Sequence, residues 1–289
     1  MTTNFAQYAV EISNAAAELE PVNLRKYSDI MAEISEVKRV SAMTLKERVL
    51  YYCKHYGEKT SSKTIFCKPL GCYISLPLSK DNSKLKGIYI FDLLAVETCM
   101  NCKDCRSYCY ATKAQKQYIN TLLRRSVMTY LAKHFLAWLE NAIVNQIKRN
   151  KNIRYVRIHS SGDFISAEYL AIWHRIARKF PRVTFYYYTK VDHLIDFSEF
   201  NSESNVNGVA SILPDGEINF GTAERVAELL RKYGDKIHVC PYHDPATRQE
   251  VRRLDANWNW RTYYIYPEIH CGRDCKICMT ERYVVFYIH

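Results

Sequence analysis

The chain has 289 residues, of which 48% are hydrophobic, with 9 Gly, 8 Pro and a formal net charge of +11. This apolar content can bury a substantial core, and the scarcity of Gly and Pro excludes a collagen-like chain and argues against a disordered one. The positive charge either serves solubility alone or favours anionic partners, with nucleic acid ahead of a membrane surface.

The sequence suggests neither a membrane span nor a secretory signal. No apolar run approaches the roughly 20 residues that cross a bilayer. Residues 1–10 lack the basic and apolar regions of a signal peptide. We therefore expect a cytoplasmic protein without a membrane partner, in which the 11 cysteines stay reduced and can bind metal.

The first part of the chain is expected to be helical. Within residues 1–57, Thr44 and Glu47 have the spacing of a capping box, and Gly57 is a suitable helix stop. Polar connectors follow at 58–63 and 81–86.

Short strands and longer helices alternate from residue 88 onward. Strands are expected at 88–94, 154–158, 183–188, 209–213, 237–240 and 283–288. One or two helices are expected within 113–150, another between Ser166 as its cap and Pro181, and another at 222–233. This alternation predicts βαβ units around a parallel sheet.

The predicted fold class is α/β, with a partial or complete (β/α) barrel, and a doubly wound sheet is the alternative. In both architectures the loops at the carboxyl ends of the strands carry the chemistry. The predicted division is a helical N-terminal extension at 1–74, a barrel-like core at 75–239 that includes the first cysteine loop, and a cysteine-rich cluster-binding segment at 240–289.

Eight of the 11 cysteines fall into two sets that suit metal clusters. The first set is Cys99, Cys102, Cys105 and Cys109, and the second is Cys240, Cys271, Cys275 and Cys278. Close thiolates repel one another unless a cation or cluster neutralises them. Short spacings let one loop supply several corners of a cubane, which a distant cysteine can complete. One or two iron–sulfur clusters, of the 4Fe-4S type, are therefore predicted.

Two alternatives to iron–sulfur ligation stay open. Four thiolates also suit a closed tetrahedral zinc site, although zinc ribbons usually pair two Cys-x2-Cys knuckles and these sets mix x2 and x3 gaps. The cysteines could also be unligated core thiols. We expect a structural role for the remaining three, Cys53, Cys67 and Cys72.

A polar cluster follows the strand predicted at 154–158. Here Gly162 permits a close backbone approach, Asp163 carries a charge at a strand end and His159 titrates near neutral pH. Together with Lys190, which follows the next strand, His159 and Asp163 are the predicted catalytic residues. Ser161, Gly162 and Asp163 are the predicted cofactor-binding residues. The alternative is a Gly-Asp turn that caps the next helix.

Several segments of the chain form a recognisable combination. They are 94–111, which contains Cys105-Arg-Ser-Tyr-Cys109-Tyr-Ala, the stretch from Arg157 to Phe164, the Tyr-Thr-Lys ending at Lys190, the last cysteine set and the terminal Phe286-x2-His289. In these segments the chain resembles the phage gene product 88 family. The resemblance covers roughly 75–289. It implies a phage or prophage origin and shared positions for Cys99, Cys105 and Cys109, with Cys102 as an addition.

A weaker similarity is to radical-SAM enzymes. In those enzymes a strand leads into a three-cysteine loop, and the next strand ends in a Gly-rich acidic motif that meets the amino group of S-adenosylmethionine. Here the strand at 88–94, the first cysteine loop and Gly162-Asp163 occur in that order. The similarity implies a radical-SAM-like barrel with S-adenosylmethionine as a second cofactor. The first loop does not read Cys-x3-Cys-x2-Cys, which counts against that cofactor.

The expected function is that of a phage iron–sulfur protein. It would act as a redox or radical-SAM-like enzyme on a small-molecule substrate or with an electron donor, with a cluster at the mouth of the barrel. One alternative is a nucleic-acid-binding protein in which clusters only brace the fold, with phosphate contacts supplied by the +11 charge. A zinc-braced interaction protein is the other.

Overall fold

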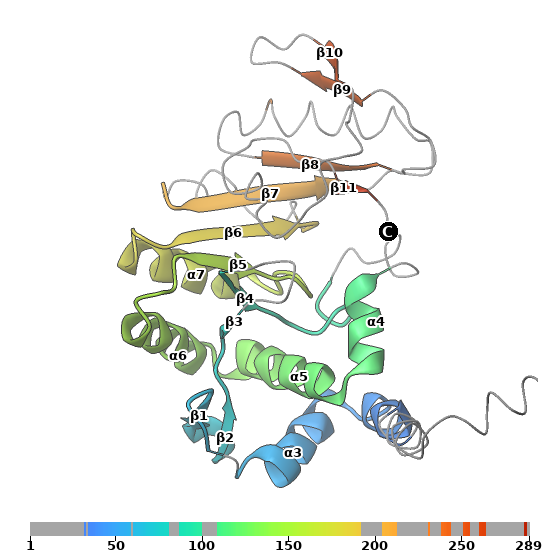
Figure 1. Ribbon diagram of the computed structural model, residues 1–289, viewed down its shortest axis with the longest axis vertical. Coiled ribbons are helices and arrows are strands. Elements are labelled where there is room, and N and C mark those ends of the chain that lie inside the picture. Colours follow the sequence, from blue (N-terminus) through green and yellow to red (C-terminus); the bar gives the residue numbers. More distant parts are fainter. Residues whose placement is uncertain are drawn as a thin grey trace, which may run out of the picture.

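The computed structural model describes residues 32, 34–58, 60–80, 87–99, 109–191, 204–212, 231, 238–243, 251–254, 260–263 and 286–287. Figure 1 shows a twisted sheet in which β4, β5, β6, β7 and β8 follow one another, with α5, α6 and α7 beside it. The N-terminal helix α3 and the small β1–β2 pair lie beyond α5 and α6, at the end of the molecule opposite β9 and β10.

The central sheet has seven strands in the order β11-β8-β7-β6-β5-β4-β3. They are β3 (Ser79–Lys80), β4 (Ile88–Phe91), β5 (Tyr155–Ile158), β6 (Thr184–Thr189), β7 (Val206–Ile212), β8 (His238–His243) and β11 (Phe286–Tyr287). All neighbours are parallel except β3, which is antiparallel to β4. Every strand expected from the sequence is present, with its ends shifted by a few residues.

The predicted α/β class is confirmed, but the predicted radical-SAM-like (β/α) barrel, partial or complete, is wrong. The sheet is open, because β3 and β11 lie at its opposite edges and no strand in the described part of the chain joins them. Closing a barrel requires the two edge strands to pair. Here the antiparallel β3 occupies the edge of β4 where a closing parallel strand would bind. The alternative prediction, a doubly wound sheet, agrees with the structure in having an open sheet. It differs in that α5, α6 and α7 all pack on one face of the sheet, whereas a doubly wound sheet has helices on both faces.

Alternate residues of the parallel strands face two different hydrophobic clusters. Phe91, Val156 and Phe185 belong to the main core, together with buried residues of α5 (Ile119–His134), α6 (Leu136–Arg149) and α7 (Ala167–Lys179). On the opposite face, Ile88, Ile90 and Tyr186 pack with Tyr155 and Tyr188. All four residues of β4 are buried, which explains its uninterrupted apolar sequence.

The helical region after the first cysteine loop contains more helices than predicted. It forms α4 (Tyr110–Gln117), α5 and α6, which are separated at Tyr118 and Phe135 by non-helical backbone. Neither position is Gly or Pro, so the sequence carries no helix-breaking signal there. The helix expected after Ser166 is confirmed as α7, and the Ser166 side chain accepts a hydrogen bond from the Tyr169 amide. Among the described helices none is long and apolar enough to cross a membrane.

The N-terminal region contains a predicted helix and an unpredicted hairpin. Thr44 and Glu47 form the expected capping box of α3 (Leu45–Tyr56), which ends at Gly57. The hairpin consists of β1 (Thr64–Cys67) and β2 (Cys72–Ser75), joined by a 3-10 turn, η1 (Lys68–Leu70). A second hairpin joins β9 (Val251–Leu254) and β10 (Trp260–Tyr263).

The domain division stays a prediction. Its boundary at 240 falls inside β8, and its N-terminal extension, 1–74, includes most of the first hairpin. The helix predicted at 222–233 lies outside the described residues except for Arg231.

Candidate functional site

Three chain segments meet at the carboxyl ends of β4, β5 and β6. Because these strands are neighbours and parallel, the segments that follow them emerge at the same edge of the sheet. They are residues 92–99 after β4, 159–163 after β5, and Lys190 with Val191 after β6. This edge carries every predicted catalytic and cofactor-binding residue and both described members of the first cysteine set.

Asp92 joins the first two segments. Its Oδ1 accepts hydrogen bonds from the amides of Ser160 (2.8 Å) and Ser161 (3.0 Å) and from the Ser160 hydroxyl (2.7 Å). Its Oδ2 lies 3.2 Å from Nη2 of Arg125, with which it forms an ion pair. Both residues are less than a tenth exposed. A buried carboxylate needs this kind of compensation, because desolvation of an unpaired charge is costly.

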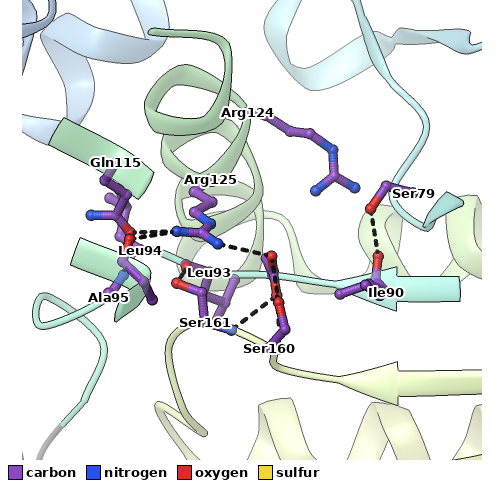
Figure 2. Close-up of polar contacts among 12 residues, drawn as sticks. Ser79, Ile90, Leu93, Leu94, Ala95, Gln115, Arg124, Arg125, Ser160 and Ser161 are labelled. Atoms are coloured by element: carbon purple, nitrogen blue, oxygen red, sulfur yellow. Dashed lines mark hydrogen bonds and ion pairs between the residues drawn. The ribbon is translucent and has the colours of Figure 1, made fainter. Parts of the chain in front are cut away.

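Arg125 extends the network to the helices. It donates to the Ala111 carbonyl in α4 (2.9 Å) and to Oε1 of Gln115 (3.3 Å). The same Gln115 oxygen accepts from the Ala95 amide at 2.6 Å, and Figure 2 shows Arg125 and Gln115 beside this loop. The Leu94 amide donates to Oγ1 of Thr129 (2.9 Å) in α5. The segment after β4 is therefore fixed along its length before it reaches Cys99.

Cys99 and Cys109 stand at the two ends of the first cysteine loop, and both are half-buried. The Cys99 amide donates to the Val96 carbonyl (3.3 Å), inside the segment that the network holds. Cys109 is the N-cap residue of α4, and the next residue, Tyr110, donates from its hydroxyl to the Ser160 carbonyl. Both ends of the loop are thus anchored to the β4–β5 corner.

The other predicted metal ligands lie outside what the structure describes. These are Cys102, Cys105, Cys271, Cys275 and Cys278. Cys240 lies inside β8, paired with Ser211, and not at a strand end as expected. Within the described residues no three His, Cys, Asp or Glu side chains form a group that could hold a metal ion. The two ligand sets therefore stay predictions.

Gly162 makes the expected close backbone approach. It has a positive φ of 81°. A Cβ at this position would lie 2.6 Å from Oγ1 of Thr98 and 2.7 Å from Cβ of Leu93. Thr98 donates to the Leu94 carbonyl (2.6 Å), so its hydroxyl is held in place. Only glycine lets the segment after β5 lie against the segment that leads to Cys99.

We expect Gly162→Ala to lower the free energy of unfolding by about 2–4 kcal/mol, since it adds an overpacked contact to a strained φ. Gly87→Ala is the matched control, because Gly87 has nearly the same φ (82°) and a Cβ added there would meet no atom of the described residues within 4 Å. The control should lose only about 1–2 kcal/mol. Urea denaturation measures both, and equal losses would contradict the close-packing account.

Asp163 braces the ends of β5 and β6. Its Oδ1 accepts from the Thr189 hydroxyl (2.6 Å) and the Phe164 amide (2.8 Å), and its Oδ2 accepts from the Lys190 amide (2.9 Å). Burial raises the pKa of this carboxyl to about 6, although these three donors act in the opposite direction. Both oxygens have partners within the protein, and Lys190 contributes its backbone amide. The alternative role as a helix cap belongs instead to Ser166.

His159 faces the aromatic core. Its backbone has a positive φ of 64°, and its ring centroid lies 4.7 Å from that of Phe164. Its Nε2 is 2.7 Å from the Tyr169 hydroxyl, and its Nδ1 has no hydrogen-bond partner within the described atoms. Burial lowers the pKa of the imidazole to about 3, so the ring is neutral near pH 7. The catalytic roles of His159, Asp163 and Lys190 stay predictions.

Sequence reasoning missed Asp92 and Arg125, which hold the site together. The available signal was an acidic residue directly after a fully apolar strand. No sequence pattern links this acidic residue, Asp92, to Arg125, which lies 33 residues later in α5.

Comparison with known proteins identifies phage relatives. The Gene product 88 family matches residues 75–285, a range that includes both cysteine sets. The Gene 88 protein of Mycobacterium phage L5 is 31% identical over 177 residues, which are 47% of this chain and 72% of that protein. The Gene 88 protein of Mycobacterium phage D29 is 28% identical over 125 residues, 38% of this chain and half the length of that relative. No solved structure matches the chain.

Proposed function

This chain belongs to the Gene product 88 family, and we propose that it is a phage iron–sulfur protein with a cluster at the carboxyl edge of its parallel sheet. The first cluster would be held by Cys99, Cys102, Cys105 and Cys109, and a second by Cys240, Cys271, Cys275 and Cys278. The observation that supports the proposal is the anchoring of both ends of the first cysteine loop to the β4–β5 corner, which the Asp92–Arg125 pair braces.

The described part of the loop suits a thiolate-bound cluster. Cys99 and Cys109 are half-buried, so their sulfur atoms have partial shielding from water and still allow entry of iron. Cys109 stands at the N-terminus of α4, where the helix dipole favours negative charge. Arg125 is a buried cation that donates directly to the Ala111 carbonyl, in the first turn of that helix. The N-terminus of α4 would favour a negatively charged sulfur ligand at Cys109.

A bound cluster would supply one-electron transfer, or Lewis acidity at an iron that lacks a cysteine ligand. The residues of the chain would position it: Asp92 fixes the two strand ends, and Gln115 and Thr129 fix the start of the loop. A reducing compartment such as the host cytoplasm would keep the thiolates available. The substrate or electron donor would approach the same edge, beside Ser161 and Lys190.

Anaerobic purification with iron, sulfide and zinc analysis tests the proposal. We expect a brown protein with about four iron and four sulfide per cluster. Cys109→Ala should remove the iron of the first cluster only, and Cys275→Ala that of the second. Cys67→Ala is the control, since Cys67 lies outside both sets and should leave the iron content unchanged. A colourless protein that contains zinc would instead identify a zinc-braced protein.

Spectra recorded with and without S-adenosylmethionine test the radical-enzyme interpretation. A change in the cluster signal that Cys109→Ala abolishes and Cys275→Ala retains would assign that cofactor to the first cluster. Identical spectra would contradict the radical-enzyme interpretation. Both carboxylate oxygens of Asp163 already accept hydrogen bonds from the protein, which agrees with that outcome.

One surface feature favours nucleic-acid binding as a second candidate function. A cavity of about 450 Å³ lies where β5 and β6 begin, lined by apolar residues and by Lys151, Arg154, Lys179 and Arg182, of which Lys179 also pairs with Glu140 at 3.1 Å. Such a cluster could bind phosphates, and binding would then weaken steeply with salt. Titration of single- and double-stranded nucleic acid at two salt concentrations tests this candidate, and salt-independent or absent binding would reject it.

A further inference from the structure

The three cysteines outside the two predicted ligand sets come together between α3 and the first hairpin. Cys53 lies in α3, Cys67 ends β1 and Cys72 begins β2. The sulfur atoms of Cys53 and Cys72 are 2.6 Å apart. Cys67 and Cys72 are paired residues of the antiparallel hairpin. All three precede residue 75, where the match to the family begins.

Backbone contacts on both sides hold the Cys53–Cys72 pair in place. The Tyr73 amide donates to the Gly57 carbonyl (2.7 Å), and the Ser75 amide donates to the Tyr52 hydroxyl (3.2 Å). A Cβ on Gly57 would lie 2.7 Å from Cβ of Cys72, so the end of α3 packs directly against β2. The two thiols are therefore neighbours because of the local fold.

We propose that Cys53 and Cys72 are a redox modification site, at which a small-molecule disulfide such as glutathione disulfide converts the two thiols into an intrachain disulfide. The Cys53 thiolate attacks one sulfur of the oxidant, forming a mixed disulfide and releasing one glutathione thiolate. The Cys72 thiolate then attacks the Cys53 sulfur, and the second glutathione leaves as a thiolate. Two protein thiols are oxidised, one glutathione disulfide is reduced to two glutathiones, and the two protons pass to these products.

The three thiols differ in access, which sets their order of reaction. Cys53 is half-buried and can meet the oxidant, whereas Cys72 is 7% exposed and Cys67 is fully buried. Burial raises the pKa of Cys67 to about 11. Burial and the neighbouring Cys53 thiol raise the pKa of Cys72. The second step should therefore be slow near neutral pH and accelerate as pH rises, while Cys67 stays reduced.

The disulfide would join β2 to α3, the helix that contacts the segment leading to the first cysteine loop. Arg48 of α3 donates to Glu97 at 2.7 Å, two residues before Cys99. Oxidation would thus stiffen the attachment of the helix on which this ion pair depends. The disulfide does not require a cluster, so its test stands apart from the iron analysis.

The test uses the purified full chain, incubated anaerobically with glutathione disulfide, alkylated and digested for mass spectrometry. We expect a peptide pair linked through Cys53 and Cys72 that separates on reduction with dithiothreitol. Cys72→Ser should stop at the mixed disulfide on Cys53, and Cys53→Ser should give neither product. Cys67→Ser is the matched control and should still form the link.

Three results would overturn the proposal. One is a wild-type chain in which both cysteines stay alkylatable after prolonged oxidation. Another is a link between Cys67 and Cys72 in place of the expected one. The third is protection of Cys53 and Cys72 from alkylation that ends when a chelator is added, which would reveal a metal site instead. These results come from the wild-type protein and do not depend on the folding of any variant.

Discussion

Asp92→Ala is expected to lower the free energy of unfolding by about 3–5 kcal/mol, the largest single effect that we predict. The substitution leaves the Arg125 guanidinium buried without its carboxylate. It also leaves the amides of Ser160 and Ser161 without the acceptor that they share. A buried charge that has lost its partner carries most of its desolvation cost.

Urea denaturation of the purified variant measures this loss. Glu140→Ala is the control, because Glu140 also pairs with two cations, Arg175 and Lys179, whose side chains are each 49% exposed. Solvent screening limits the value of such pairs, so the control should lose only about 1 kcal/mol. A double substitution, Asp92→Ala with Arg125→Met, should recover part of the loss by removing the unpaired charge. Similar losses in the two single variants would show that burial of the paired cation, Arg125 as against Arg175 and Lys179, does not decide the effect.

The second large effect concerns how the free energy of unfolding depends on pH. Asp163 and His159 contribute to this dependence with opposite signs. The folded-state pKa of Asp163 is raised from 3.8 to about 6, so the folded protein binds this proton more readily than the unfolded chain. Stability from Asp163 is therefore present below pH 3.8 and is lost as pH rises to about 6.

His159 has the opposite sign. Its folded-state pKa is lowered from 6.5 to about 3, so the unfolded chain takes up the proton first. Stability from His159 is present above pH 6.5 and is lost as pH falls toward 3. The two windows overlap, and the two dependences largely cancel in the wild-type protein.

Single variants should separate the two dependences. In Asp163→Asn, only the His159 dependence is left, and the free energy of unfolding should fall by about 2 kcal/mol as pH is lowered from about 6 to about 4. In His159→Asn, only the Asp163 dependence is left, and the free energy should rise by a similar amount. Asn is a suitable replacement at position 159, because it tolerates the positive φ found there.

Urea denaturation midpoints measured at several pH values give, for each variant, the slope of the free energy of unfolding against pH. Other titrating groups are common to the two variants, so the difference between their slopes isolates the two residues. Slopes of the same sign and size would contradict the burial of one of the two groups.

Local sequence determined most of the helices and strands of this protein. The capping box of α3, the Ser166 cap of α7 and the apolar sequence of β4 act over a few residues, and the structure contains all three. Gly162 was also predictable, because a glycine after a strand signals a close backbone approach. The breaks at Tyr118 and Phe135 were not, since neither residue opposes a helix strongly.

Only the tertiary structure decided how these elements combine. The same order of strands and helices suits an open or a closed sheet, and the outcome depended on β3 pairing with the edge of β4. The Asp92–Arg125 ion pair and the contact between Cys53 and Cys72 join residues that are distant in sequence. The ring of His159 packs against the aromatic ring of Phe164 in the core, although His159 directly follows the end of a strand. Local patterns cannot specify such contacts, because they arise from the packing of whole elements against one another.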